Sequence, residues 1–221
     1  MAFPYKYKAI IFDLDGTLMD TLEDLGAAVN TALKAHGFPG HTRTEYSGMV
    51  GHGVRNLVHR ALPEGVPPST EEACFNAFME YYTSHLDVYT RPYPGMVELL
   101  EELDAAGVKL AVASNKFQSG AEYLVNKYFP KVNFVAILGN APGLPLKPDP
   151  SIVTTVLHSA GLSASDPVAM VGDSLTDMRT AENAGITGIA VNWGYRDMSD
   201  NSRLAESVDA LRELLLLKHN G

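Results

Sequence analysis

Short apolar runs alternate along the chain with longer stretches in which apolar residues recur every three or four positions. The short runs have the length of strands, and the longer stretches have the period of amphipathic helices. The strand candidates are residues 9–12, 108–113, 134–138, 168–171 and 186–191. Because strands that alternate with helices favour parallel pairing, we expect an α/β fold with a Rossmann-like, doubly wound parallel sheet.

The pattern changes between the first two strand candidates. Helical periodicity appears there without a convincing strand, at residues 22–33, 54–62 and 71–86. Proline and glycine between Arg91 and Gly95 mark the return to the sheet pattern. We therefore predict an inserted all-helical cap domain, residues 18–91, within a discontinuous core domain formed by residues 1–17 and 92–221. The crossings between the two domains are predicted to act as hinges.

Composition limits the partners and the location of the protein. With 46% hydrophobic residues, the 221-residue chain can bury a substantial core. Its formal charge of -9, without any basic run, argues against nucleic acid and anionic membrane surfaces as partners. No apolar run approaches the ~20 residues of a membrane span, and the single cysteine, Cys74, cannot form an intrachain disulfide. The cytoplasm is the expected location, and a homodimer is left open.

Polar side chains follow the predicted strands at the points where the strands end. Asp13 and Asp15 follow the first strand, and their two-residue spacing directs them to the same side. Later strands or their loops are followed by Ser114, Asn115, Lys147, Asp173 and Asp177. Because the carboxyl ends of parallel strands meet at one edge of a sheet, we expect all of these side chains to share one cleft.

The acidic residues of this set point to a metal ion. Four carboxylates in one cleft would repel one another unless a cation compensated, and oxygen ligands suited to phosphate chemistry favour Mg²⁺. Each motif also has a purely structural explanation. The spacings Thr17 to Asp20 and Ser174 to Asp177 are those of a capping box, and Ser114 has the character of an N-cap. The ordered set of motifs, more than any single one, favours a catalytic function.

Taken together, Asp13 to Thr17, Ser114, Lys147 and Gly172 to Asp177 resemble, in order, the four motifs of the haloacid dehalogenase-like hydrolases. The resemblance implies that Asp13 is a nucleophile that attacks phosphorus and forms an aspartyl-phosphate. It implies that Asp15 first protonates the leaving oxygen and then activates the water that attacks the intermediate.

The same resemblance assigns the remaining site residues. Mg²⁺ would be held by Asp13, Asp15 through its backbone carbonyl, and Asp173, with Asp177 orienting the site. Ser114 and the backbone of Asn115, at the N-terminus of a helix, would bind phosphoryl oxygens. Lys147 would neutralise the charge that grows in the transition state.

Over nearly the whole chain the sequence resembles the phosphoglycolate phosphatase branch of that family. The segments that carry this resemblance are Val50-Gly51-His52-Gly53, Tyr93-Pro94-Gly95, Ser114-Asn115-Lys116 and Asn192-Trp193-Gly194-Tyr195. Gly51 and Gly53 would let the cap backbone approach the substrate, and His52 and Arg55 are candidate carboxylate binders. The alternatives are a solvated loop histidine for His52 and a solvated helix face for Arg55.

Three positions bear on the reaction. The acid at Asp15 favours phosphoryl transfer, because similar dehalogenases and phosphonatases lack it. Leu25 stands where sugar phosphomutase relatives carry a histidine, which favours hydrolysis. Phe117 replaces the proline that often follows the lysine in phosphoglycolate phosphatases, which leaves the substrate open.

We therefore predict an enzyme, a Mg²⁺-dependent phosphatase acting on a small anionic phosphate monoester, with 2-phosphoglycolate as the lead substrate. A pyrophosphatase, a sugar phosphatase or a phosphomutase is the alternative within the family. A non-catalytic phosphate-binding protein is the alternative from another class.

Overall fold

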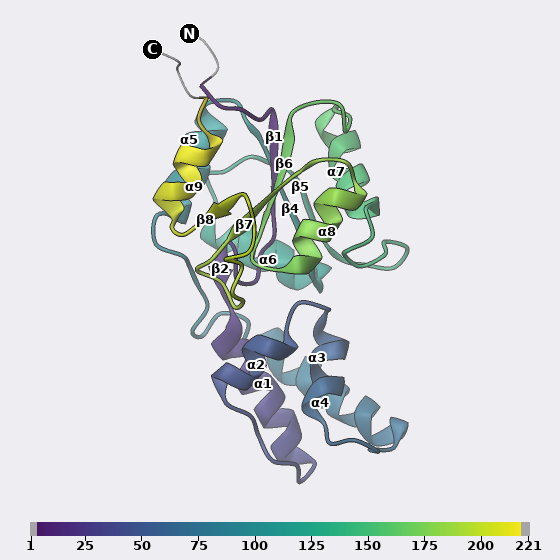
Figure 1. The fold of residues 1–221 in the computed structure, drawn as a ribbon. Helices are drawn as coiled ribbons and strands as arrows, with labels where there is room; N and C mark the ends of the chain where they lie inside the picture. The colour runs from purple at the N-terminus through teal and green to yellow at the C-terminus, as the bar shows by residue number, and fades with distance from the viewer. Residues whose placement is uncertain (1–3, 218–221) are drawn as a thin grey trace.

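The computed structural model describes residues 4–217, and its core is a six-stranded sheet flanked by helices (Figure 1). All neighbouring strands of this sheet are parallel, and their spatial order is β5-β4-β1-β6-β7-β8. The strands are β1 (Ala9–Phe12), β4 (Lys109–Phe117), β5 (Phe134–Asn140), β6 (Val168–Gly172), β7 (Thr187–Val191) and β8 (Leu204–Ala205). The five predicted strands are confirmed, and the two-residue edge strand β8 is additional.

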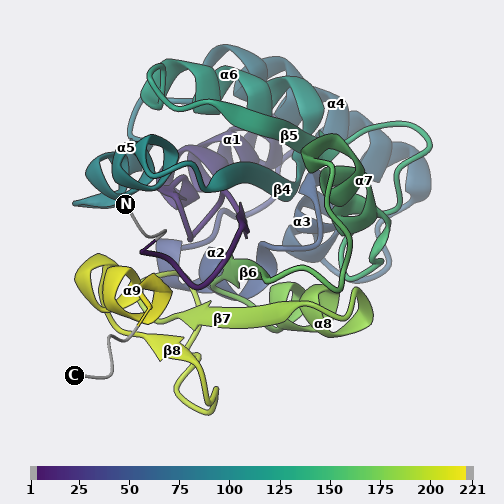
Figure 2. The same ribbon diagram turned by 90° about the horizontal axis from the view of Figure 1, so that it is seen from above.

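Helices cover both faces of the sheet, as a doubly wound fold requires. They are α5 (Met96–Ala105), α6 (Gln118–Tyr128), α7 (Ser151–Ala160), α8 (Leu175–Asn183) and α9 (Val208–Leu215). Successive residues of β1 alternate between the two faces: Ile10 packs in one buried cluster with α5, α6 and α9, and Ile11 packs in the other with α7 and α8. Figure 2 shows α5 and α9 on one side of the sheet and α7 and α8 on the other. The predicted α/β class is confirmed.

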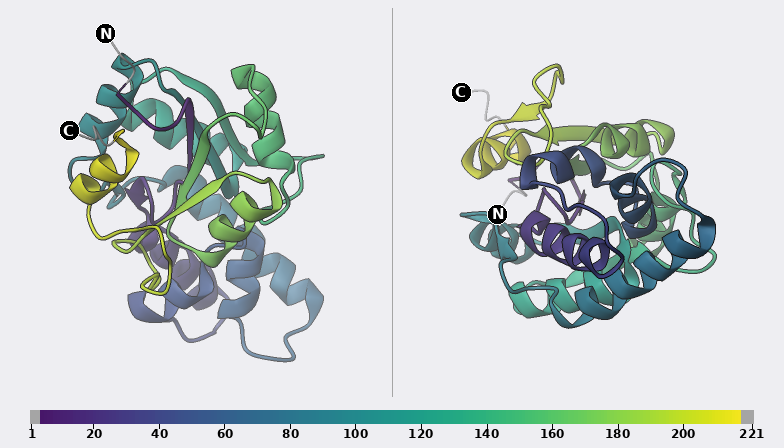
Figure 3. Two further views of the ribbon diagram at one scale, coloured as in Figure 1. Left: turned by 45° about the horizontal axis from the view of Figure 1, so that its top comes forward. Right: turned by 90° about the horizontal axis from the view of Figure 1, so that it is seen from below.

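The chain between β1 and α5 forms the helical cap. It contains α1 (Leu22–Ala35), α2 (Arg43–Met49), α3 (Val54–Ala61) and α4 (Pro68–Ser84). Seen from below, these helices lie across one end of the sheet (Figure 3). Helix α2 is short and polar, so its periodicity is weak, but Thr42 and Glu45 form the capping box that starts it. No helix in the part of the chain that the structure describes is long and apolar enough to cross a membrane.

The two crossings between core and cap pair with each other. Strand β2 (Met19–Asp20) on the outgoing crossing is antiparallel to β3 (Arg91–Pro92) on the returning one. The buried carboxylate of Asp24 accepts hydrogen bonds from the backbone N–H groups of Tyr89 and Thr90, at distances of 2.8–3.1 Å. The first turn of the cap thereby holds the returning crossing. The Thr17 to Asp20 capping box does not form, because α1 begins only at Leu22.

Candidate functional site

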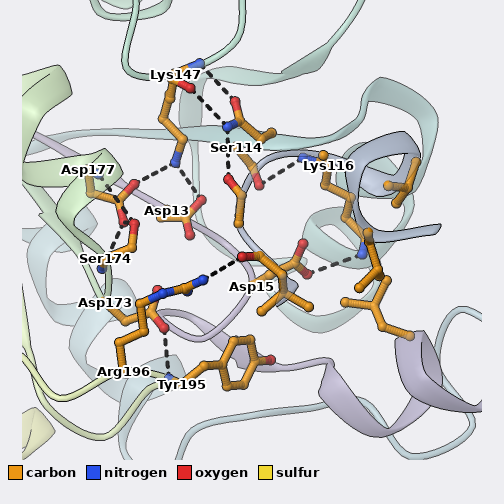
Figure 4. Close-up of a pocket in the computed structure, with 17 residues that line it drawn as sticks. Asp13, Asp15, Ser114, Lys116, Lys147, Asp173, Ser174, Asp177, Tyr195 and Arg196 are labelled. Atoms are coloured by element: carbon orange, nitrogen blue, oxygen red, sulfur yellow. Dashed lines mark hydrogen bonds and ion pairs between the residues drawn. The ribbon is translucent and has the colours of Figure 1, made fainter. Parts of the chain in front are cut away.

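A pocket lies where the carboxyl ends of β1, β4 and β6 face the cap (Figure 4). The core lines it with Asp13, Asp15, Ser114, Asn115, Lys116, Lys147, Asp173, Ser174, Asp177, Tyr195 and Arg196. The cap lines it with Leu25, Val50, Gly51, Gly53, Val54 and Leu57. Of the candidate catalytic, metal-binding and substrate-binding residues, all line the pocket except His52 and Arg55.

Lys147 joins two carboxylates at the centre of the site. Its Nζ donates hydrogen bonds of 2.7 Å to Oδ1 of Asp13 and to Oδ1 of Asp177, and all three side chains are buried. Burial alone would lower the pKa of Lys147, but the two carboxylates hold it above its usual range. Lys147 is therefore a fixed ammonium next to Asp13.

Asp177 has a structural role as well as a place in the site. Its Oδ2 accepts hydrogen bonds from the backbone N–H of Ser174 at 3.1 Å and from the Ser174 hydroxyl at 2.5 Å. Ser174 in turn caps helix α8, so the capping box expected from the sequence is present. Because Lys147 occupies the other oxygen, both oxygens of Asp177 have partners within the protein.

Asp13 and Asp173 have the features of metal ligands. Ligand oxygens of Asp13, Asp173 and Asp177 all lie within 4.8 Å of one another. Burial, followed by the neighbouring carboxylates, raises the pKa of Asp173 to about 8, and burial is also the main cause that raises the pKa of Asp13 to about 6. A divalent cation would offset this repulsion, and an all-oxygen donor set fits Mg²⁺. Since both oxygens of Asp177 are already engaged, Asp13 and Asp173 are the better ligands.

Glycines make room for Asp173. A Cβ at Gly194 would lie 2.3 Å from the Asp173 Cβ, and one at Gly16 would lie 2.3 Å from its Oδ2. The backbone N–H of Tyr195, next to Gly194, donates a 2.8 Å hydrogen bond to the same Oδ2. The Asn192 to Tyr195 segment therefore positions the carboxylate, which gives a physical reason for the glycine in that segment.

Lys116 was not singled out in the sequence as a site residue, although it belongs to the Ser114-Asn115-Lys116 segment. Its buried Nζ donates to Asp15 Oδ1 at 3.1 Å and to the Tyr82 hydroxyl at 2.5 Å. Asp15 Oδ1 also accepts a 2.7 Å hydrogen bond from the Thr21 hydroxyl. A lysine within three residues of a buried apolar run was the available signal, because a buried ammonium requires an anionic or polar partner.

The expected helix N-terminus at Ser114 and Asn115 is wrong. Strand β4 continues to Phe117, which pairs with Asn140 of β5, and α6 begins at Gln118. Asn115 instead uses its side chain to join three segments. Its Oδ1 accepts from the Lys147 N–H at 2.8 Å, and its Nδ2 donates to the carbonyls of Lys147 and Gly51 at 3.2 and 3.0 Å. Asn115 thereby holds both the lysine loop and the cap.

The cap presents its backbone and apolar side chains to the pocket. Gly51 and Gly53 both have positive φ angles, +106° and +83°. The side chain of His52 is exposed, and Arg55 pairs with Glu72 at 2.5 Å and lies over the Phe75 ring. Arg196, which follows the Asn192 to Tyr195 segment, lines the pocket instead, and its Nη2 donates a 2.6 Å hydrogen bond to the Val50 carbonyl.

The sequence of this chain is similar to known proteins over most of its length. A sequence profile of the family described as haloacid dehalogenase-like hydrolase matches residues 10–191. The phosphoglycolate phosphatase of Mesorhizobium japonicum is 35% identical over 191 residues, which cover 85% of this chain and 84% of that relative.

Solved structures share the fold. A provisionally named phosphoglycolate phosphatase from Lactobacillus delbrueckii subsp. bulgaricus superposes with a TM-score of 0.90 at 32% identity, covering 96% of this chain and 99% of that one. CbbY from Rhodobacter sphaeroides, in complex with phosphate, gives a TM-score of 0.71 at 25% identity, covering 93% of this chain and 99% of that one. With coverage this high, the likeness includes the cap as well as the core.

Proposed function

Because this chain belongs to the haloacid dehalogenase-like hydrolases, we propose that its pocket hydrolyses a small phosphate monoester through an aspartyl-phosphate formed on Asp13. The names of its relatives place it among the phosphoric monoester hydrolases. The observation that carries the proposal is the pairing of Asp13 with the buried ammonium of Lys147, with a second acid, Asp15, lining the same pocket. Such a set supplies a nucleophile, a charge stabiliser and an acid–base group.

In the first half of the reaction, a carboxylate oxygen of Asp13 attacks phosphorus and the bond to the leaving oxygen breaks. Asp15 gives its proton to that oxygen, so the alcohol departs neutral. Lys116 and Thr21 both contact Oδ1 of Asp15, and Oδ2 has no hydrogen-bond partner among the described residues. Oδ2 is therefore the oxygen that can exchange a proton with the substrate.

In the second half, Asp15 takes a proton from a water molecule that attacks the phosphorus of the intermediate. The bond to Asp13 breaks, which restores its carboxylate and releases inorganic phosphate. Lys147, Ser114 and the backbone of Asn115 are the proposed partners of the phosphoryl oxygens, as their places in the pocket allow. Both halves thus use the same acid–base group in opposite directions.

Mg²⁺ fits the acidic end of the pocket. We assign Asp13, the backbone carbonyl of Asp15 and Asp173 as its ligands, with Asp177 as their support through Lys147 and Ser174. When bound, the ion would reduce the repulsion between the nucleophile and the phosphate, so that the two anions can approach.

The cap, proposed as residues 18–91 on a core of residues 1–17 and 92–221, closes the site. The carbonyls of Val50 and Gly51 are bound by Arg196 and Asn115 of the core, at 2.6 and 3.0 Å. Substrate entry requires these contacts to open, and the paired crossings β2 and β3 are the proposed hinge. Closure would exclude bulk water while the intermediate forms.

The lead substrate is 2-phosphoglycolate, which the names of the relatives support. The test is phosphate release from 2-phosphoglycolate, pyrophosphate and hexose phosphates, each with Mg²⁺ and with a chelator. A preference for 2-phosphoglycolate that disappears on chelation is expected. Equal release with and without the chelator would contradict the metal assignment. Release from no phosphate ester would contradict the phosphatase and favour a binding protein.

A further inference from the structure

Arg196 is the basic side chain of the pocket with the most donors to spare. Lys147 is engaged by Asp13 and Asp177, and Lys116 by Asp15 and Tyr82. Arg196 forms no ion pair among the described residues, and its one hydrogen bond is to the carbonyl of Val50. Because a guanidinium carries five N–H donors, most of those of Arg196 remain available to a ligand.

The cap wall of the closed pocket carries no charged side chain. The cap residues that line it are Leu25, Val50, Gly51, Gly53, Val54 and Leu57. A leaving group rich in hydroxyls would have to bury them against these apolar side chains without partners, at a cost for each group. A short leaving group with a single anionic end needs only one cation. The pocket supplies that cation from the core.

The cap backbone leaves room beside the guanidinium. Figure 4 shows the Arg196 side chain extending into the pocket from the side of Asp173 and Tyr195, toward the space between Asp13 and Asp15. Gly51 lies beside it, and a Cβ there would be 3.4 Å from Nη1 of Arg196. Closure therefore brings the side-chain-free Gly51 next to Nη1 of Arg196, while Nη2 is bound by the carbonyl of Val50.

From these observations we propose that Arg196 binds the carboxylate of the substrate and selects phosphate esters of a short hydroxycarboxylic acid. The inference rests on the proposed phosphatase function and names the side chain that recognises the leaving group of the substrate. A guanidinium can bind a carboxylate through two parallel hydrogen bonds, which fixes orientation as well as charge. In this proposal Arg196 takes the role of carboxylate binder that the sequence suggested for His52 and Arg55, whose side chains do not line the pocket.

The test compares two esters of similar size, 2-phosphoglycolate and 2-hydroxyethyl phosphate, which lacks the carboxylate. In Arg196→Gln, kcat/KM for 2-phosphoglycolate is expected to fall by about 10- to 100-fold, mainly through KM. The loss for 2-hydroxyethyl phosphate is expected to be much smaller, and Arg196→Lys should fall between wild type and Arg196→Gln. Arg55→Gln is the matched control, because it removes an exposed arginine of the cap that pairs with Glu72.

Two results would overturn the inference. One is an equal loss for both esters in Arg196→Gln, which would mean that Arg196 only balances the charge of nearby Asp173. The other is a loss confined to Arg55→Gln.

A binding measurement distinguishes failure of this inference from failure of the proposed function. Titration of 2-phosphoglycolate into Asp13→Asn protein, with and without Arg196→Gln, measures recognition without turnover. Weaker binding in the double variant supports the carboxylate site even if wild-type protein hydrolyses no ester. Equal binding in both overturns the inference and leaves the phosphatase intact.

Discussion

Lys116 Nζ of strand β4 donates a 2.5 Å hydrogen bond to the hydroxyl of Tyr82 in helix α4, and so joins the core to the cap. The same ammonium contacts Asp15 at 3.1 Å. Burial raises the pKa of Tyr82 to about 12, so its hydroxyl stays neutral and accepts the bond. The position of Asp15 is thereby connected to whether the cap is seated on the core.

We expect Tyr82→Phe to lower both stability and kcat. The buried ammonium of Lys116 would lose one acceptor, which costs about 1–3 kcal/mol of unfolding free energy, and Asp15 would be held less firmly. Denaturant unfolding and steady-state kinetics measure the two effects. Tyr81→Phe is the control, because the Tyr81 ring stacks on His85 outside the pocket. Equal kcat in Tyr82→Phe and Tyr81→Phe would contradict the role of the bond.

Asp13→Asn should abolish turnover, because an amide cannot act as the nucleophile. A loss of at least about 10³-fold is expected in phosphate release. Wild-type protein quenched in acid during turnover should gain the mass of one phosphoryl group, and the variant should not. Asp166→Asn, which alters a surface pair with Lys8, should keep normal turnover. Full activity of pure Asp13→Asn protein would rule out the covalent intermediate.

Metal-free protein should lose stability as pH rises from about 4 to about 8. The pKa of Asp173 is raised to about 8 in the folded protein, so between the unfolded and folded values the native state binds more protons than the unfolded one. Raising the pH through this range therefore favours unfolding. Thermal unfolding in chelator at several pH values measures the slope.

Addition of Mg²⁺ should reverse this trend, since a cation stabilises the ionised carboxylates. Asp173→Asn should flatten the pH dependence in chelator and remove the stabilisation by Mg²⁺. A Mg²⁺ response in Asp173→Asn as large as in wild type would argue that the ion binds elsewhere.

Gly51→Ala should impair the closed pocket. The residue has a φ of +106°, which strains an alanine, and a shift of the backbone to relieve that strain would move the new Cβ, 3.4 Å from Nη1 of Arg196, relative to the guanidinium. We expect KM for 2-phosphoglycolate to rise by about three- to tenfold, measured in the same assay. Gly48→Ala in helix α2 is the control, because no atom lies within 4 Å of its added Cβ. A larger effect at Gly48 than at Gly51 would contradict the close approach.

The local pattern of apolar residues predicted the sheet well, because the interior strands are buried on both faces and therefore appear in the sequence as apolar runs. Strand β8 has only Leu204 and Ala205, too few residues to show any period. The sequence did not predict the pairing of β2 with β3, because each of these strands also has only two residues. Their pairing depends on where the chain returns to the core after the cap. The true start of α6 was missed because a partner strand, β5, extends β4 to Phe117.

Among the site residues, the sequence identified those in the segments that follow the carboxyl ends of the strands. Asp13 directly follows β1, so topology brings it to the carboxyl edge of the sheet. Lys147 lies in the loop after β5, and Asn115 holds that loop at the same edge. Arg196 follows a loop, and its approach to the pocket depends on a turn held by Asp173 and on the carbonyl of Val50. Arg55 looked suitable by type and spacing, but helix α3 turns it toward Glu72. Tertiary contacts therefore determine that Arg196 lines the pocket and that Arg55 does not.

The pairing of β2 with β3 also says how the chain accommodates its cap. Asp20 and Arg91 stand opposite each other across one antiparallel pair, about 5 Å apart in such a ladder. From the side of the core, residues 21–90 are the loop between the two strands of a single hairpin. Because the entropic cost of closing a loop grows only slowly with its length, that hairpin can hold a bundle of four helices or a short turn with little change to the sheet. The cap of this enzyme is thus an exchangeable insertion, because its two connections to the core lie side by side.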